Sequence, residues 1–275
     1  MSALPRRLRP SALPAVLLLL QLPFGSPVAG EPLDPNCLEA CPLTAGDNLI
    51  VRRPSHTLSN NAGTKFADWV AYEVVPADIG KSQKRVWRAD PEIPAQQTLE
   101  PSDYKGAHRA LQTDRGHQAP LASFTGAPDW QTTNYLSNIT PQKSALNQGP
   151  WKNLENAVRK LARSEAGRVH VLTGPLYERE MPPLPEADEP HRVPSGYWKI
   201  VLLTRGDTVQ AAGFVLDQET PRRAGYCDGS FAVTVAEIAR RSGLVFAPGI
   251  GAAGGGDLRS WLGCREPVTV STVAD

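Results

Sequence analysis

Residues 113–160 bring together side chains suited to acid–base and metal chemistry. The tetrapeptide Asp-Arg-Gly-His ends at His117, whose imidazole, with an ordinary pKa near 6.5, can be neutral at working pH, as a general base must be. Asn147 stands at the head of a helical pattern further along and offers a neutral oxygen to a hard cation. Because Mg²⁺ keeps several waters and takes few protein ligands, one asparagine can suffice to hold it.

This segment resembles the signature of the DNA/RNA non-specific endonucleases, a family of ββα-metal nucleases. The resemblance lies in the Asp-Arg-Gly-His run and in the asparagine that follows at the head of a helix. Four further runs similar to the family lie in order along the chain: KFADWVAY from Lys65, LNQGPW from Leu146, TGPLYER from Thr173 and GYWK from Gly196. A four-residue motif alone would be weak evidence, but ordered matches over most of the chain argue against coincidence.

The resemblance implies an endonuclease that hydrolyses phosphodiester bonds in DNA and RNA, double- and single-stranded, and leaves 5′-phosphate ends. The implied cofactor is Mg²⁺, with Mn²⁺ as a substitute. A phosphodiester carries negative charge and must be attacked in line by water, so its site needs a base, a cation and hydrogen-bond donors. Two alternatives stay open, namely an exported nucleic-acid-binding protein without turnover and a phosphodiesterase for another phosphoester.

The resemblance also implies roles for individual residues. His117 would be the general base and Asn147 the metal ligand. Glu155 lies about 12 Å further along the same helix at 1.5 Å per residue, so we expect it to orient metal-bound water rather than bind the metal directly. Arg85 and Arg115 would bind the phosphate, and bidentate geometry is available to each guanidinium. Three more residues match family positions around the site with a substrate-binding or supporting role: Asn134, Asn138 and Arg159.

Some of these residues have a second interpretation. Asp114 looks like a metal ligand, yet we expect it to support its strand or to pair with a nearby arginine. Glu155 and Arg159 are also spaced as an ordinary i,i+4 helix pair. We set aside the glycosylation sequon at Asn138, where a glycan would block the site, and the glycine motif of residues 249–254, which no second strand follows.

The elements that must position these residues are mainly strands. A helix is predicted over Pro150–Arg163 by an apolar stripe, and a shorter one over Val233–Arg241. Since strands and helices do not alternate regularly, we expect an α+β fold with a mainly antiparallel central sheet flanked by helices and long loops. Apolar and β-branched runs predict strands over Phe66–Val75, Val169–Thr173, Tyr197–Leu203, Ala211–Leu216 and Leu244–Ala247.

The family resemblance adds a ββα-metal motif at the active site. It consists of a strand that bears His117, a loop through Asp129, a returning strand near Tyr135–Pro141, and the helix from Pro150.

The first thirty residues have the three parts of an export signal. Basic residues come first, an apolar stretch follows from Leu13 to Phe24, and small residues end at Gly30. The apolar stretch is too short for a membrane span. We therefore predict a signal peptide over residues 1–30 and a single domain over residues 31–275, secreted to the periplasm or outside the cell and not membrane-bound.

Cysteines and charge give two further expectations. Four cysteines in an exported chain predict two disulfides, and of three possible pairings we favour the nearest neighbours, Cys37 with Cys41 and Cys227 with Cys264. Loss of three arginines with the signal lowers Lys+Arg from 29 to 26 against 28 Asp+Glu. A slightly acidic chain that binds nucleic acid must gather its positive charge locally. The family resemblance leaves a homodimer open.

Overall fold

The computed structural model of the chain describes residues 34–164, 166–253 and 258–264. The predicted signal peptide lies outside these residues, and so does the tail after Cys264. Within the described ranges, no helix is both long enough and apolar enough to cross a membrane.

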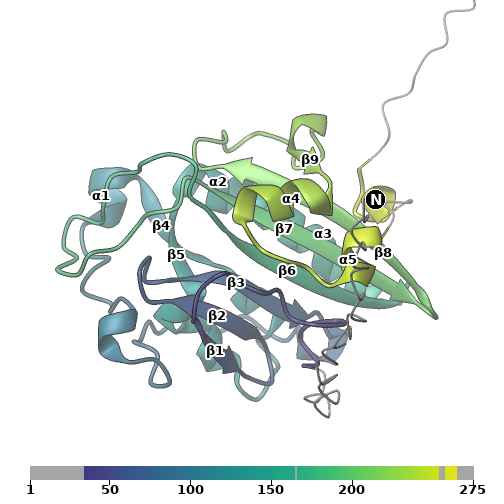
Figure 1. The fold of residues 1–275 in the computed structure, drawn as a ribbon, viewed down its shortest axis with the longest axis horizontal. Helices are drawn as coiled ribbons and strands as arrows, with labels where there is room; N and C mark the ends of the chain where they lie inside the picture. Colours follow the sequence, from purple (N-terminus) through teal and green to yellow (C-terminus); the bar gives the residue numbers. More distant parts are fainter. Residues whose placement is uncertain (1–33, 165, 254–257, 265–275) are drawn as a thin grey trace, which may run out of the picture. The chain divides into compact units, whose positions relative to one another are not determined.

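A seven-stranded sheet forms the centre of the fold (Figure 1). Every neighbouring pair of its strands is antiparallel. This arrangement confirms the predicted α+β class with a mainly antiparallel sheet. In spatial order the strands are β1 (Leu49–Arg52), β2 (Thr57–Asn61), β3 (Phe66–Glu73), β6 (Arg168–Leu176), β7 (Gly196–Arg205), β8 (Thr208–Asp217) and β9 (Ala232–Val233).

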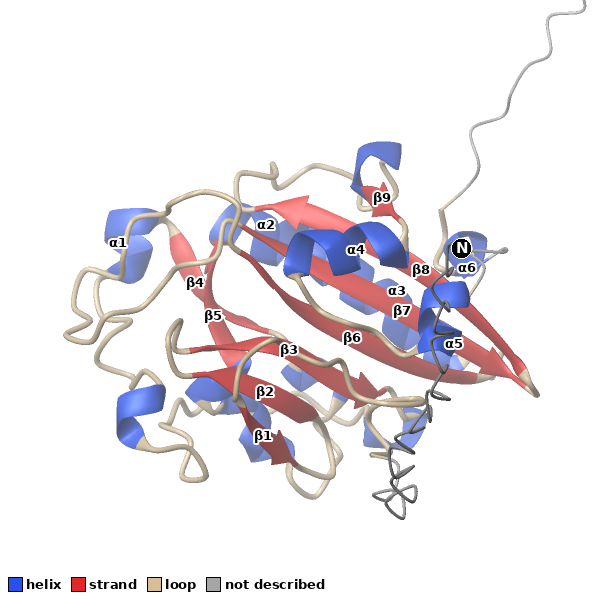
Figure 2. Cartoon of the chain, in the orientation of Figure 1, coloured by secondary structure: helices blue, strands red, loops and turns tan. Residues whose placement is uncertain are grey.

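Helices cover both faces of this sheet (Figure 2). Because side chains alternate along a strand, the odd-numbered apolar residues of β7 pack against α3 (Lys152–Arg163), and the even-numbered ones pack on the side of α4 (Val235–Ser242) and α5 (Pro248–Ala252). The central strands are therefore apolar on both faces. The remaining helices are short: α1 (Ala107–Leu111), α6 (Leu258–Trp261) and the 3-10 turns η1 (Pro76–Asp78), η2 (Ala95–Gln97), η3 (Leu121–Ser123), η4 (Trp130–Asn134) and η7 (Gly229–Phe231).

The strand predicted over Leu244–Ala247 is wrong. Only Val245 pairs, in an isolated bridge with Leu43. Leu244 is buried on the α4 face of the sheet, and the ring of Phe246 meets Trp198 edge-on with a centroid separation of 5.6 Å. The apolar pattern of this run therefore reflects a loop that packs onto the sheet.

A separate two-stranded hairpin carries the Asp-Arg-Gly-His run. Its strands are β4 (Thr113–His117) and β5 (Ile139–Lys143), and His117 pairs with Ile139. The returning strand was expected to start near Tyr135, but residues 136–138 form the 3-10 turn η5 (Leu136–Asn138) instead.

The buried amide of Asn138 explains this later start. It accepts a hydrogen bond from the Ala119 N–H at 2.8 Å and donates to the carbonyls of Ala119 and Thr133 at 2.9 and 2.8 Å. These bonds fix the end of the loop before β5 begins.

The helix predicted from Pro150 begins in an irregular way. A short helix α2 (Ser144–Leu146) leads into a π-helical turn, η6 (Asn147–Trp151), and α3 follows. The backbone is non-helical at Gly149, where a Cβ atom would lie 2.5 Å from the carbonyl oxygen of Arg222. Asn147 therefore does not cap the helix: its φ of −56° and ψ of −48° are helical, and its side chain makes no capping bond.

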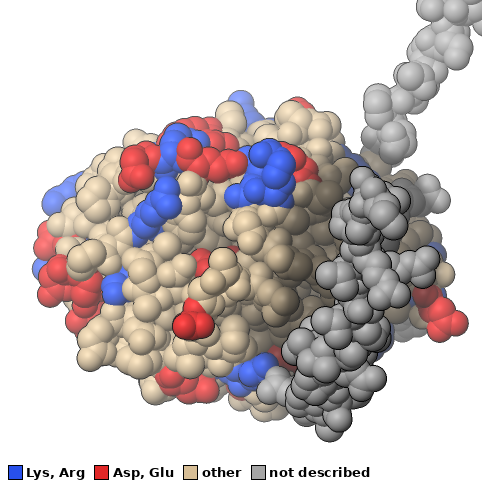
Figure 3. Space-filling model, in the orientation of Figure 1, with Lys and Arg blue, Asp and Glu red and all other residues tan. Residues whose placement is uncertain are grey.

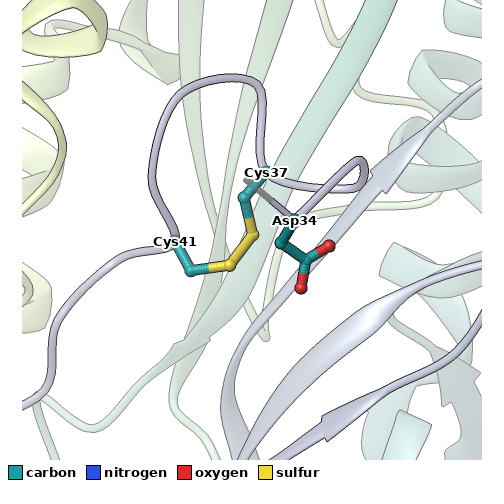
Figure 4. A group of neighbouring side chains, drawn as sticks. All are labelled: Asp34, Cys37 and Cys41. Carbon is teal, nitrogen blue, oxygen red and sulfur yellow. A yellow bond between two sulfur atoms is a disulfide. The ribbon is translucent and has the colours of Figure 1, made fainter. Parts of the chain in front are cut away.

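Both predicted disulfides are confirmed. Cys37 bonds to Cys41, and Cys227 bonds to Cys264, which ties the segment before β9 to the end of α6. Asp34 lies beside the first bridge (Figure 4). Because both sulfur atoms of this group are already in the disulfide, the group is not a metal site.

Candidate active site

A cleft of about 680 Å³ gathers the residues to which the sequence pointed. The loop between η1 and η2 contributes Arg85, the strand β4 contributes Arg115 and His117, and η6 and α3 contribute the rest. Six of the eight predicted site residues line this one cleft: Arg85, Arg115, His117, Asn147, Glu155 and Arg159. Asn134 and Asn138 lie behind it and are buried.

His117 is held in place by two neighbours. Its Nε2 lies 3.1 Å from Oδ1 of Asn134, and its ring meets the indole of Trp87 with a centroid separation of 5.3 Å. Because the amide oxygen can only accept, Nε2 carries the proton and Nδ1 keeps a free lone pair. Burial lowers the pKa of His117 to about 4, and the charge of Arg85 adds to this effect against the opposing bond to Asn134. The imidazole is therefore neutral at neutral pH.

Asp114 orients Asn147. Its carboxylate accepts hydrogen bonds from Ser144 Oγ at 2.7 Å, Asn147 Nδ2 at 2.9 Å and Gln148 Nε2 at 2.7 Å. Burial alone would raise the pKa of Asp114, but these bonds lower it below its usual range. The ring of His108, whose Nδ1 lies 3.3 Å from Oδ1 of Asp114, takes the place where an arginine was expected.

The donor set fits a hard divalent cation. A carboxylate accepts only, so Asp114 turns the NH₂ of Asn147 toward itself and leaves Oδ1, to which no described residue donates. A neutral oxygen of this kind, with water, suits a cation that takes few protein ligands. The clusters of acidic and sulfur side chains found elsewhere in the described ranges contain no residue of the cleft.

The two predicted phosphate-binding arginines keep donors available. Arg115 donates to the carbonyl of Pro101 at 2.9 Å, and its guanidinium lies between the rings of Trp87 and Tyr104. Its Nε is buried without a partner, and burial lowers the pKa of the group, which still stays protonated. Arg85 is exposed and, in the part of the chain that the structure describes, forms no ion pair.

Glu155 and Arg159 lie on the cleft side of α3. Burial raises the pKa of the Glu155 carboxyl, whereas Lys199, Arg159 and the indole N–H of Trp151 lower it. Arg159 donates to Ser123 Oγ at 3.4 Å and to Asn156. The two side chains form no direct ion pair, so the simple i,i+4 helix pair is not made.

The sequence did not single out every residue of the cleft. Trp87, Tyr104 and Gln148 also line it. Trp87 stands two residues after Arg85, and an aromatic residue so close in sequence to a predicted phosphate-binding arginine was the available signal. The buried Asn138 side chain, with all its hydrogen bonds made inside the protein, is no acceptor for a glycan.

Basic side chains line the cleft, namely Arg85, Arg115, Lys152 and Arg159. On the face that carries α4, basic and acidic side chains are interspersed (Figure 3). Some basic residues of the N-terminal half are internal: Arg53 is 6% exposed and bonds to both oxygens of Asp90 at 2.7 Å.

Comparison with known proteins decides the family. The model of the DNA/RNA non-specific endonucleases matches residues 35–253. The chain belongs to this family. It is 45% identical to a nuclease of Serratia marcescens over 239 residues, which cover 86% of this chain and 89% of the relative. It is 31% identical to human mitochondrial endonuclease G, with 74% and 71% covered.

A solved structure shows the same fold. The crystal structure of an EndoG/EndoGI complex matches with a TM-score of 0.63 at 22% identity, covering 74% of this chain and 87% of that one. This DNA/RNA non-specific endonuclease is accordingly a hydrolase of phosphodiester bonds that depends on a divalent metal, and family membership sets aside both the non-catalytic alternative and the other-phosphoester alternative.

The depressed pKa of His117 predicts how the nuclease titrates. In metal-free protein, the imidazole should protonate near pH 4, because burial disfavours its charged form. Arg85→Ala should raise this pKa, since it removes a repelling charge. Two-dimensional NMR of the histidine ring, with the signal assigned by its loss in His117→Ala, measures both values.

The lowered pKa of His117 also determines how the stability of the fold changes with pH. An unfolded chain binds this proton near pH 6.5 and the folded one only near pH 4, so the contribution of His117 to stability is lost as the pH falls through that window. A ring that titrates at or above pH 6.5 in the folded protein would contradict this description of the site.

Proposed function

We propose that this chain is a secreted endonuclease that cuts DNA and RNA, double- and single-stranded, with His117 as general base, Asn147 as ligand of Mg²⁺ and 5′-phosphate ends as products. One observation carries the proposal: a neutral imidazole and an amide oxygen that Asp114 leaves without a donor line the same cleft as two arginines with unused donors. Mn²⁺ has the same preference for oxygen ligands and is the expected substitute.

The chemistry follows from what each side chain can do. The free Nδ1 of His117 takes a proton from water as that water attacks phosphorus. The guanidinium groups of Arg85 and Arg115 donate to phosphate oxygens and stabilise the charge that grows on them. The Glu155 carboxylate accepts hydrogen bonds from water in the cleft and so orients it. A divalent cation held by Asn147 would supply positive charge that offsets the negative charge developing on the leaving oxygen.

Supporting residues keep these groups in place. Asn134 fixes the tautomer of His117, and Asn138 fixes the loop that holds Asn134. Arg159, bonded to Ser123, adds positive charge beside Glu155. Contacts to phosphates carry no sequence information, which accounts for a broad substrate range.

The cellular location is also part of the proposal. The signal-like residues 1–30 and the two disulfides support export of a domain that spans residues 31–275 to the periplasm or outside the cell. Relatives in mitochondria show that the family occurs in other compartments as well. A homodimer is the assembly that we propose from the family resemblance.

Purified protein tests the function directly. We expect it to degrade linear double-stranded DNA, single-stranded DNA and RNA in buffer with Mg²⁺, because the arginines contact only the shared phosphate backbone. Excess chelator should abolish all three activities, and added Mg²⁺ or Mn²⁺ should restore them. Full cleavage in the presence of chelator, or cleavage of only one class of nucleic acid, would contradict the proposal.

The role of His117 as base rather than acid has its own test. His117→Ala should lose about 10²–10⁴-fold in rate on DNA, the usual share of general base catalysis, while KM changes little. A phosphodiester with a nitrophenolate leaving group needs no proton on departure but still needs an activated water. The variant should therefore remain equally impaired on that substrate, and recovery to the wild-type rate would show that His117 protonates the leaving group instead.

A further inference from the structure

A lysine lies in the interior of the protein, behind the active site. Lys199 is 0% exposed and stands on β7 between Tyr197 and Val201, which face α3. Because side chains alternate along a strand, Lys199 points to the same layer, between the central sheet and α3. Its neighbours across the sheet, Thr173 on β6 and Phe214 on β8, carry no charge.

The contacts of Lys199 do not neutralise its charge. The ammonium Nζ lies 4.4 Å from the ring centroid of Trp151 and 3.4 Å from the hydroxyl of Tyr72. No carboxylate among the described residues lies within ion-pair distance of it. Removing a cation from water costs more free energy than one cation–π contact returns. Packing alone therefore gives no reason for a lysine where an apolar side chain would fit.

The acid that interacts with this lysine is Glu155. Trp151 and Glu155 are spaced i,i+4, so their side chains project from the same face of the helix. Among the charges that favour the ionised form of Glu155, Lys199 ranks ahead of Arg159. The interaction is mutual, because Glu155 is the main influence that opposes the lowering of the Lys199 pKa by burial, to about 8.

Few groups around Glu155 can favour its ionised form. Arg159 flanks it on α3, and the ionisable Tyr72 faces it from β3. Nε1 of Trp151 has no partner in hydrogen-bond geometry, yet it lies close enough to favour the Glu155 carboxylate. Burial pushes the other way and raises the pKa of Glu155. A carboxylate that must accept hydrogen bonds from water in the cleft therefore depends on a cation behind it.

We propose that Lys199 is a positioning residue for the nuclease reaction, an interior cation that acts through Glu155 and keeps its carboxylate ionised and directed into the cleft. This inference rests on the proposed role of Glu155. Lys199 itself does not contact the cleft, since it is buried in the layer behind it.

Lys199→Met tests the proposal, because methionine has a similar volume and no charge. In metal-free protein with ¹³C-labelled glutamate carboxyls, the Glu155 signal is the one that Glu155→Gln removes. Its pKa should rise by about 1 unit or more in Lys199→Met. The acid limb of the pH–rate profile should move up by the same amount. Lys160→Met, an exposed charge removed from the same helix, is the matched control and should move neither.

Stability separates this role from a structural one. No described carboxylate lies within ion-pair distance of Lys199, and methionine removes a charge that is costly to bury, so Lys199→Met should stay folded and melt close to the wild type. If that variant does not fold, Lys199→Gln gives the same measurement with a polar uncharged side chain.

Two outcomes would overturn the proposal. One is an unchanged Glu155 pKa and acid limb in folded Lys199→Met. The other is that the rate losses of Lys199→Met and Glu155→Gln add in the double variant, because residues that act through one group do not add. If Glu155→Gln itself cuts at the wild-type rate, the proposed role of Glu155 fails instead, and the carboxyl titration still reports the coupling.

Discussion

The active site depends on one carboxylate that joins two elements. Asp114 lies on β4, three residues before His117, and accepts hydrogen bonds from Ser144, Asn147 and Gln148 in the segment that leads into α3. The proposed base, His117, and the proposed metal ligand, Asn147, are thus fixed relative to one another by a single group. The pairing of Asp114 with Gln142 and of His117 with Ile139 sets the register of the hairpin that carries both.

The rest of the fold supports this arrangement from behind. The apolar stripe of α3 packs on one face of the sheet and so fixes the helix that presents Glu155. A buried pair, Arg53 with Asp90, anchors the loop that ends at Asn138, because Asp90 also accepts a hydrogen bond from Ser137. Buried charges of this kind are weak contributors to stability, but they specify one position for the loop. Lys199 is a further buried charge, and we propose that it specifies the position of the Glu155 carboxylate in the same way.

Much of this could be predicted from the sequence, for reasons that differ between elements. Long apolar runs in the sequence predict the strands β3, β6, β7 and β8. The resemblance of the Asp-Arg-Gly-His run to the family signature predicted the residues that line the cleft. The π turn at Asn147 was missed because it depends on the close approach of the Arg222 backbone to Gly149, which no local pattern encodes. Leu244–Ala247 has the apolar composition of a strand but only an isolated bridge for pairing. Lys199 looks like a solvated residue until the sheet is known to be covered on both faces.

The orientation of Asn147 by Asp114 is the central claim, and divalent metal affinity tests it most directly. Calorimetric titration of Mn²⁺ into the wild type and into Asp114→Asn compares their metal affinities. The asparagine has the same shape as Asp114, but because its amide both donates and accepts, it no longer fixes which end of the Asn147 amide faces it. Loss of a group that orients a metal ligand typically costs 10–100-fold in affinity, and we predict a weakening of about that size with the fold intact. Equal affinity of the folded variant and the wild type would contradict the account.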